Sequence, residues 1–400
     1  MIRGGQPITV IGAGVAGLTV ARALALRGAS VTVLEQAAAL KDIGAGIQIS
    51  PNGAAVINAL GLGPGLAAQS MPAQSVCLRD GLTDKAVLTM DLTRGREKNG
   101  FHLIHRADLI TLLQDGAVKA GVDIRLGQKI ESVDLSGPTP VVHLMDGTTF
   151  KPTVLIGADG LHSPVRTALN GPEAPFFTHQ VAWRATIPNG ASDDPVVEVH
   201  MGPGRHLVSY PLRGAQLRNI VAVEERSGWT AESWSLQDDP ANLQRAFASF
   251  SPRVRDWVAQ VGKPNLWGLY RHPVAAVWHK ATPAGGAVIL GDAAHPSLPF
   301  LAQGANMALE DAWSLAQAIA GNASLKSALS GYQDARKPRT AAIVAAANTN
   351  ARAYHLSGAP RRIAHLGLRI GGSIAPNFAL RRFDWIYRHD VTEGQILAKS

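Results

Sequence analysis

Three glycines near the start of the chain have the spacing of a nucleotide-binding turn. The motif Gly12-x-Gly14-x-x-Gly17 follows the apolar run Ile8–Ile11 and opens an alanine-rich helical segment. Glycines at this spacing allow a tight turn and let backbone N–H groups and a helix N-terminus meet a pyrophosphate. Glu35 ends the next apolar run, where a carboxylate can accept hydrogen bonds from an adenosine ribose. The motif predicts a dinucleotide site but does not separate NAD from FAD, because both carry the same ADP half.

Two more carboxylates stand at the ends of strand-like runs further along the chain. Asp159, followed by Gly160, comes after Val154–Ile156, and Asp292 comes after Ala287–Leu290. The carboxyl ends of parallel strands meet at one edge of a sheet, and ligands bind there. We therefore expect both carboxylates beside the same ligand as the glycine motif.

A third segment leads from Pro299 into a helix that we expect from about Asn306 to Ala320. Gly304, Ala305 and Asn306 lie at its start, where backbone N–H groups have no partner within the helix. The helix dipole favours negative charge at this end.

Taken together and in this order, the three motifs resemble the single-component FAD-dependent aromatic hydroxylases, a family that includes salicylate, 3-hydroxybenzoate and 6-hydroxynicotinate hydroxylases. The resemblance covers roughly residues 7 to 345. It implies an α/β fold with a Rossmann-like FAD-binding domain, as in p-hydroxybenzoate hydroxylase, a β-sheet substrate domain and C-terminal helices. It also implies FAD as cofactor and NADH or NADPH as co-substrate. The implied reaction hydroxylates a small aromatic acid with dioxygen, through a flavin hydroperoxide.

The resemblance assigns cofactor contacts to residues throughout the chain. The glycine motif and Glu35 would hold the ADP half, Arg106 the phosphates or their linker, and Asp292 the ribityl hydroxyls. Asp159 and Gly160 would serve both FAD and the nicotinamide, and the helix start at Gly304 would face the pyrimidine end of the flavin. Gly44-Ala45-Gly46-Ile47-Gln48 resembles the segment that lets the flavin ring move. The expected cofactor-binding residues are Gly12, Gly14, Ala16, Gly17, Glu35, Gly46, Gln48, Arg106, Asp159, Gly160, Asp292, Gly304, Ala305 and Asn306.

The substrate side is predicted from a strand, His206–Tyr210. Residues two apart on a strand share a face, so His206 and Tyr210 point the same way, roughly 13 Å apart. This His-x-x-x-Tyr spacing is similar to that in family members acting on 3-hydroxybenzoate or 6-hydroxynicotinate, where the pair orients or deprotonates the ring hydroxyl. A structural role for His206 remains an alternative. The expected substrate-binding residues are Gln48, His206, Tyr210, Pro299 and Phe300, with His206 and Tyr210 catalytic.

One departure from the family concerns Pro299 and Phe300, which stand where several relatives have a polar or histidine side chain. Neither can transfer a proton, so acid-base work would fall to His206, Tyr210 or water.

The halogenases on the same scaffold bear Trp-x-Trp-x-Ile-Pro, whereas this chain has Ala185 in place of the second tryptophan of that motif. The alternatives that stay open are a hydroxylase of a pyridine carboxylate such as 6-hydroxynicotinate, and a flavoprotein redox or binding module without hydroxylase activity.

The predicted domains are discontinuous. Residues 1–75, 100–174 and 284–345 would form the FAD-binding domain, 76–99 and 175–283 the substrate domain, and 346–400 a C-terminal helical segment. We expect a loop over Gly44–Pro51, and we expect Pro338, Pro360 and Pro376 to interrupt the closing helices.

Composition bounds the remaining classes. The chain has 400 residues, 46% of them hydrophobic, and no apolar run of the roughly 20 residues that a membrane span needs. Its single cysteine, Cys77, cannot form an internal disulfide, so redox chemistry requires a cofactor. We expect a cytoplasmic protein with no metal, no nucleic-acid partner and no integral membrane association. A homodimer is common in this family, and the sequence leaves the oligomeric state open.

Positive charge is concentrated at the C-terminal end of the chain. Of the formal net charge of +8, residues 351–400 contribute +5, from eight Lys or Arg against three Asp or Glu. A solvated helical face is the first interpretation of this segment, and a dimer contact or an anionic-lipid contact is the alternative.

Overall fold

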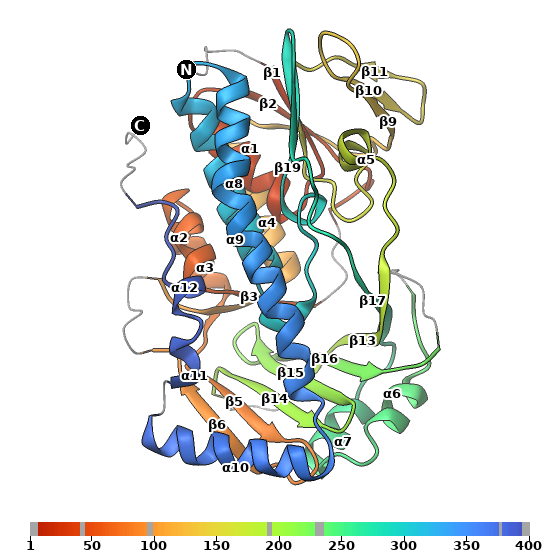
Figure 1. Ribbon diagram of the computed structural model, residues 1–400, viewed down its shortest axis with the longest axis vertical. Coiled ribbons are helices and arrows are strands. Elements are labelled where there is room, and N and C mark those ends of the chain that lie inside the picture. Colours follow the sequence, from red (N-terminus) through yellow and green to blue (C-terminus); the bar gives the residue numbers. More distant parts are fainter. Residues whose placement is uncertain are drawn as a thin grey trace.

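The computed structural model describes residues 7–40, 45–93, 99–189, 194–228, 236–375 and 378–393 (Figure 1). Two large sheets form its two halves, with helices around the first and along the sides of the second. The predicted α/β fold with a second, sheet-based region and C-terminal helices is confirmed.

The first sheet has six strands and follows the pattern of buried apolar runs. All neighbouring pairs are parallel except β18 with β19. Strands such as β12 and β19 are buried at every residue, as expected for a sheet covered on both faces. In spatial order the strands are β18 (His279–Thr282), β19 (Gly285–Ile289), β12 (Val154–Gly157), β1 (Pro7–Ile11), β2 (Ser30–Leu34) and β8 (Asp123–Arg125).

Helices pack on this sheet and on one another through apolar faces. Helix α1 (Val15–Ala25) contacts both α4 (Arg106–Lys119) and α8 (Gly304–Gly321), and α8 contacts α9 (Leu325–Tyr354). The buried core here includes the side chains of Leu18, Leu24, Trp278 and Trp313. Shorter helices complete this half: α2 (Pro51–Ala59), α3 (Gly63–Gln69) and α5 (Pro164–Asn170).

Two small sheets adjoin the first half. One consists of β9 (Ile130–Asp134), β10 (Val141–Leu144) and β11 (Thr149–Phe150). The other consists of β3 (Gly46–Ile49), β7 (His102–His105) and β4 (Met71–Pro72). Strand β3 corrects the prediction of a loop over Gly44–Pro51: residues 46–49 pair with β7, because their backbone can join a strand despite the local glycines. Gly44 itself lies outside the described residues.

The second sheet has seven strands, and its two faces differ. Only β14 and β5 run parallel to each other. One face carries Trp183 and Leu207 under helices α6 (Pro240–Ala246) and α7 (Pro252–Ala259). The other face looks toward the first half of the molecule. In spatial order the strands are β17 (Asn265–Arg271), β13 (Phe176–Pro188), β16 (Leu217–Glu225), β15 (Arg205–Leu212), β14 (Val196–Gly202), β5 (Ser75–Asp80) and β6 (Ala86–Asp91).

Helix α9 connects the two halves, and it runs without interruption through Pro338 (Figure 1). The expectation that Pro338 ends a helix is therefore wrong. A proline inside a helix removes one hydrogen bond, but ion pairs to α8 hold α9 on both sides of it: Arg336 Nε to Asp311 at 2.8 Å and Arg339 Nε to Glu310 at 2.8 Å.

The end of the described chain first follows the second sheet and then returns to the first half, where α12 (Asp384–Tyr387) contacts α2. Helix α10 (Gly358–Ile374) lies along β6, and two short helices follow, α11 (Phe378–Arg381) and α12. Pro360 falls in the first turn of α10, where a proline is tolerated, so it does not interrupt that helix. Pro376 lies outside the described residues. Three predicted domain limits differ from the elements: residue 75 begins β5 of the second sheet, residue 345 falls inside α9, and β18 joins the first sheet.

Candidate functional site

The glycine turn after β1 is formed by close approaches of backbone. Gly12 has a φ of +99°, and a Cβ there would overlap the carbonyl oxygen of Ala158 at the end of β12. A Cβ on Gly17 would overlap the carbonyl oxygen of Gly12. Gly14 differs, because a Cβ there would meet no atom within 4 Å. Gly12 and Gly17 are therefore required by the turn itself, whereas the space beside Gly14 is open.

Glu35 lies beside this turn, at the end of β2. Its carboxylate accepts hydrogen bonds from the backbone N–H of Ala13, at 2.7 Å, and of Ala37, at 2.9 Å. The carboxylate therefore reaches the N-terminal end of α1, where negative charge is favoured.

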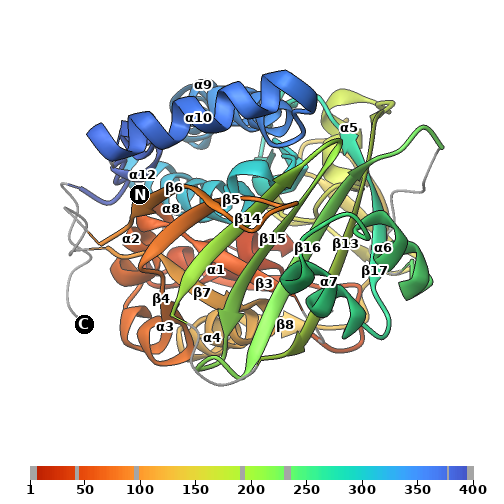
Figure 2. The same ribbon diagram turned by 90° about the horizontal axis from the view of Figure 1, so that it is seen from below.

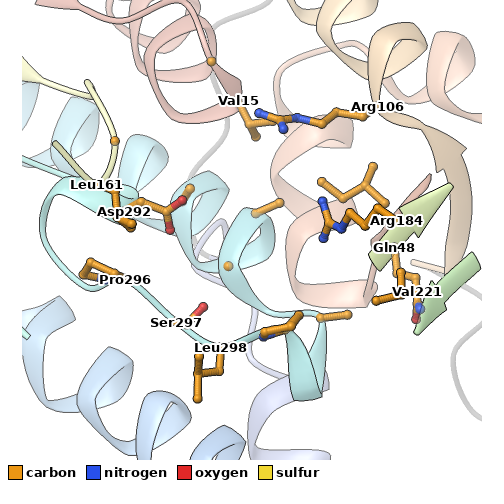
Figure 3. A pocket seen from close by; sticks show the side chains of 18 of the residues that line it. Val15, Gln48, Arg106, Leu161, Arg184, Val221, Asp292, Pro296, Ser297 and Leu298 are labelled. Atoms are coloured by element: carbon orange, nitrogen blue, oxygen red, sulfur yellow. The ribbon is translucent and has the colours of Figure 1, made fainter. Parts of the chain in front are cut away.

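A single cavity of about 350 Å³ extends from the glycine turn to the second sheet (Figure 3). Nine of the fourteen predicted cofactor residues line it: Gly14, Ala16, Gly46, Gln48, Arg106, Gly160, Asp292, Gly304 and Ala305. The other five, Gly12, Gly17, Glu35, Asp159 and Asn306, are not among the lining residues. Of the predicted substrate residues, Gln48, Tyr210 and Pro299 line the cavity, whereas His206 and Phe300 do not.

Figure 3 shows Asp292 on one side of this cavity and Gln48, Arg184 and Val221 on the other. Asp292 belongs to the short 3₁₀ turn η1 (Gly291–Ala293) that follows β19. Its side chain is exposed to the cavity, yet enclosure by protein raises the pKa of the carboxyl; the positive charge of Arg106 opposes this rise. Arg106 begins α4, and its backbone N–H donates to the carbonyl oxygen of Ala45 at 2.9 Å.

Asp159 follows β12 and is not a lining residue itself, although its neighbours Ala158 and Gly160 line the cavity. Burial raises its pKa to about 6, and neither of its carboxyl oxygens has a hydrogen-bond partner in the described ranges. Gly160, the next residue, has a φ of +73°, and a Cβ there would meet no atom within 4 Å. The Asp-Gly pair therefore presents an open stretch of backbone next to a carboxyl group that titrates near neutral pH.

The N-terminal end of α8 points at the cavity through Gly304 and Ala305. No side chain caps this 18-residue helix, so its first N–H groups remain available to a ligand. The Asn306 side chain has a different function from its backbone. It accepts from the N–H of Ser50 at 3.0 Å and donates to the carbonyl oxygen of Gln48 at 3.1 Å, which fastens α8 to β3.

Tyr210 is the predicted catalytic residue that reaches the cavity. Its ring lies against β3, since a Cβ on Gly46 would be 2.6 Å from Tyr210 Cε2 and 2.8 Å from its hydroxyl oxygen. Burial raises the pKa of Tyr210, although the charge of Arg184 and a hydrogen bond with Gln48 act in the opposite direction. Tyr210 is therefore a neutral phenol that can donate a hydrogen bond into the cavity.

His206 lies on the same strand face as Tyr210 but is not among the lining residues, and its ring contacts Phe300, with the two ring centroids 5.8 Å apart. Its Nδ1 is 2.7 Å from His355 Nε2, and His355 Nδ1 is 2.7 Å from Glu225 Oε1. Burial lowers the pKa of His206, so its imidazole is neutral. Because a carboxylate only accepts, His355 donates from Nδ1 and accepts at Nε2 from His206; the lone pair of His206 is then on Nε2.

Arg184 is a cavity residue that the sequence analysis did not assign to the site. It lies on β13 opposite Val221 of β16, and its guanidinium stacks 4.6 Å from the centre of the Trp267 ring. In the sequence, Arg184 stands two residues after Ala182, so on a strand it lies on the face opposite Trp183. Which face borders the cavity becomes clear only from the pairing of β13 with β16 and β17.

Two other kinds of feature are absent from the described ranges. None of the helices there combines the length and apolar character needed to cross a membrane. Within the same ranges, no three His, Cys, Asp or Glu side chains are grouped to hold a metal ion.

Comparisons with known proteins point in one direction. A family model described as FAD binding domain matches residues 6–347. The chain is 37% identical over 361 residues to 3-amino-4-hydroxybenzoate 2-monooxygenase of Streptomyces cremeus, covering 88% of this chain and 89% of that protein. It is 31% identical over 408 residues to 3-hydroxybenzoate 6-hydroxylase of Polaromonas naphthalenivorans (strain CJ2), covering 98% of both. A salicylate hydroxylase substrate complex shares the fold, with a TM-score of 0.79 at 21% identity over 99% of this chain and 98% of that chain.

Proposed function

The chain belongs to the FAD binding domain family and is an FAD-dependent monooxygenase, and from this premise we propose that it hydroxylates the ring of a hydroxybenzoate-type acid. The family resemblance inferred from the three motifs is thereby confirmed. The observation that carries the proposal is the single cavity described above. One wall of this cavity consists of the predicted nucleotide-binding turns. The opposite wall consists of Arg184, Tyr210 and apolar side chains.

The first wall fits FAD. The backbone at Gly14 and Gly160 is open, because a Cβ at either position would meet no atom within 4 Å. The uncapped start of α8 offers N–H groups to the electron-rich end of a flavin, and Arg106 offers positive charge to its phosphates. When bound, FAD supplies the redox chemistry, with NADH or NADPH as electron donor and dioxygen as the oxygen source. Asp292 would hold the ribityl hydroxyls.

The second wall suits a small aromatic anion. Arg184 provides a positive charge, and its guanidinium is kept in place by stacking on Trp267. A guanidinium binds a carboxylate through paired hydrogen bonds. Val208, Val221 and Leu269 provide apolar surface for a ring and keep water away from it. Arg184 would thus bind the carboxylate of the substrate.

Tyr210 and Gln48 would orient the ring hydroxyl of the substrate. The neutral phenol of Tyr210 can donate to that oxygen, and the packing of its ring against Gly46 of β3 holds the phenol in position. A hydrogen bond to a phenolate oxygen favours the ionised substrate, and an ionised ring is richer in electrons and more easily oxidised. Pro299 closes the cavity beside them without contributing a proton.

His206 would act as the proton acceptor behind this wall. The His355 and Glu225 contacts leave its Nε2 unprotonated, so that nitrogen can take up a proton while Nδ1 passes one to His355. The Glu225 side chain is 52% exposed, so the chain of groups ends at solvent. Since neither His206 nor Phe300, whose ring contacts it, is among the lining residues, the proton would have to reach His206 by way of water or a movement of side chains.

The experiment is an anaerobic measurement of flavin reduction by NADH and by NADPH with candidate substrates present. The panel contains 3-hydroxybenzoate, 3-amino-4-hydroxybenzoate, salicylate and 6-hydroxynicotinate, with benzene as the uncharged control. We expect at least one acid to accelerate reduction, and its product in air to gain one oxygen atom. If none does so, the chain is a flavoprotein redox or binding module instead.

A further inference from the structure

Helix α10 carries a continuous apolar stripe on its outer side. Ile363, Leu366, Ile370 and Ile374 are 71%, 58%, 52% and 80% exposed. Their spacing of three or four residues puts them on one face of the helix. Single exposed aliphatic side chains are ordinary, but four in a row along one helix indicate a surface that contacts something else.

The opposite side of α10 is already anchored to the protein. Arg361 Nη1 lies 3.1 Å from Asp80 Oδ1, and His365 Nδ1 lies 3.3 Å from Asp80 Oδ2. Gly372 lies against Leu88 of β6, where a Cβ would be 2.6 Å from Leu88 Cδ1. The helix is therefore held in place by its inner side, and Figure 2 shows it as the outermost layer of this part of the molecule.

The charge next to the stripe has one sign. Helix α10 contains three arginines and no acidic residue, and Arg362 and Arg369 are exposed beside the stripe. Further along, Phe378 is 71% exposed and is followed by the exposed Arg381 and Arg382. An apolar stripe bordered by arginines is the composition of helices that lie in the interface of an anionic membrane.

We propose that α10 docks the protein on an anionic lipid surface, with the stripe in the acyl boundary and the arginines at the headgroups. A second copy of the chain is a poorer occupant, because a two-fold contact would bring this all-basic helix against the same helix. An anionic headgroup layer satisfies both the stripe and the charge. The association is peripheral, since no helix of the described ranges could span a bilayer.

The test is co-sedimentation of the FAD-loaded protein with vesicles. One set consists of phosphatidylcholine alone, and the other contains phosphatidylglycerol in addition. We expect binding to the second set only, and release by salt at 1 M, where the Debye length falls to about 3 Å. Equal binding to both sets, or to neither, overturns the proposal.

Variants assign the binding to α10. The pair Ile363→Ser with Ile370→Ser should weaken vesicle binding by about tenfold or more, because burial of apolar side chains drives interfacial binding. Arg362→Gln should weaken it about fivefold. Val118→Ser is the matched control, since Val118 is 55% exposed on α4, a helix that Figure 2 shows at the opposite edge of the molecule from α10.

Two further readings complete the test. FAD content and thermal unfolding should be the same in the double variant and in the unaltered protein, because the exchanged side chains are exposed. Sedimentation equilibrium in the absence of lipid tests whether a second copy of the chain covers this face instead. A dimer that the double variant turns into a monomer would show that a second copy covers this face, and would contradict lipid docking. These readings do not depend on hydroxylation, so they stand or fall separately from the proposed reaction.

Discussion

The two walls of the cavity are built in different ways. The wall of the first sheet presents mainly backbone, at Gly14, Gly160 and the start of α8, beside the side chains of Arg106 and Asp292, while the wall of the second sheet presents side chains such as Arg184 and Tyr210. A wall made of backbone binds a ligand through the geometry of its turns, so its ligand specificity cannot change unless the turns change. A side-chain wall can change its ligand one residue at a time. The cofactor half is therefore constrained by folding, and the substrate half by the choice of side chains on a stable sheet.

The largest expected effect comes from adding a methyl group to the backbone wall. Gly17→Ala would force its Cβ against the carbonyl oxygen of Gly12, so the turn must shift at a cost of about 1–3 kcal/mol, and FAD retention should be lost. Gly14→Ala is the matched control: its Cβ has room, so the apoprotein should unfold at the same temperature while FAD binding alone weakens. Equal thermal stability and equal FAD content in both variants would show that the turn is not rigid.

Asp159→Asn separates stability from ligand binding on the same wall. Burial raises the pKa of Asp159 to about 6, so the unfolded chain ionises this group first as pH rises. The folded state then loses stability between about pH 4 and pH 6, by about 3 kcal/mol at most. Above pH 6, Asp159→Asn should therefore be more stable than the unaltered apoprotein. Below pH 4, the two proteins should be equally stable. Thermal unfolding across this range measures it, and a difference that does not depend on pH would exclude the carboxyl as its cause.

Arg184→Met tests the side-chain wall. Loss of a hydrogen-bonded charge costs about 1.5–3 kcal/mol, which corresponds to roughly 10- to 150-fold weaker binding of the aromatic acid. FAD content should not change, because Arg184 lies on the second sheet. Arg271→Met, at the exposed end of β17, is the control for removal of an arginine from this sheet. A loss of FAD in Arg184→Met, or equal effects of the two changes, would contradict the division of the cavity.

Tyr210→Phe should have a smaller effect. It removes one hydrogen bond to the ring hydroxyl, worth about 1 kcal/mol, and should slow hydroxylation or divert NAD(P)H consumption toward hydrogen peroxide. The ratio of product formed to NAD(P)H consumed measures this. FAD should stay bound; unchanged coupling would remove Tyr210 from the mechanism.

His355→Leu should have the smallest effect, because His355 acts only through His206. Without His355 as hydrogen-bond acceptor, His206 no longer prefers the tautomer with its lone pair on Nε2. The hydroxylation rate should therefore fall a few-fold, and the pH dependence of that rate should change shape. Val344→Ala, on helix α9 ahead of His355, is a packing control, expected to alter stability but not the pH profile. A pH profile that His355→Leu leaves intact would make this chain of groups structural.

The backbone wall was predictable from sequence and the side-chain wall was not, for a physical reason. The turns at Gly12, Asp159 and Asp292 each follow one strand, so a short contiguous segment specifies their geometry. Arg184 reaches the cavity only through the register of β13 with its neighbours, which includes an irregularity between Phe177 and Gln180. No local pattern encodes that register.

Long-range packing also explains the individual places where the predictions and the structure differ. His206 does not line the cavity, and the residues that its ring contacts, Phe300 and His355, are far away from it in sequence. Strand β3 forms because β7 pairs with it, and α9 continues through Pro338 because Arg336 and Arg339 anchor it to α8. Local propensity predicts a loop and a break at these places, and tertiary contacts override both predictions.

The most direct test of a shared cavity is a titration of the oxidised FAD-loaded protein with 3-hydroxybenzoate and 3-amino-4-hydroxybenzoate, followed by flavin absorbance. An acid bound next to the flavin changes the surroundings of the ring, so we expect a saturable spectral change with at least one of them. Arg184→Met should require a much higher concentration of the same acid while keeping its FAD. A flavin spectrum that no aromatic acid alters, or an identical titration in Arg184→Met, would contradict the account.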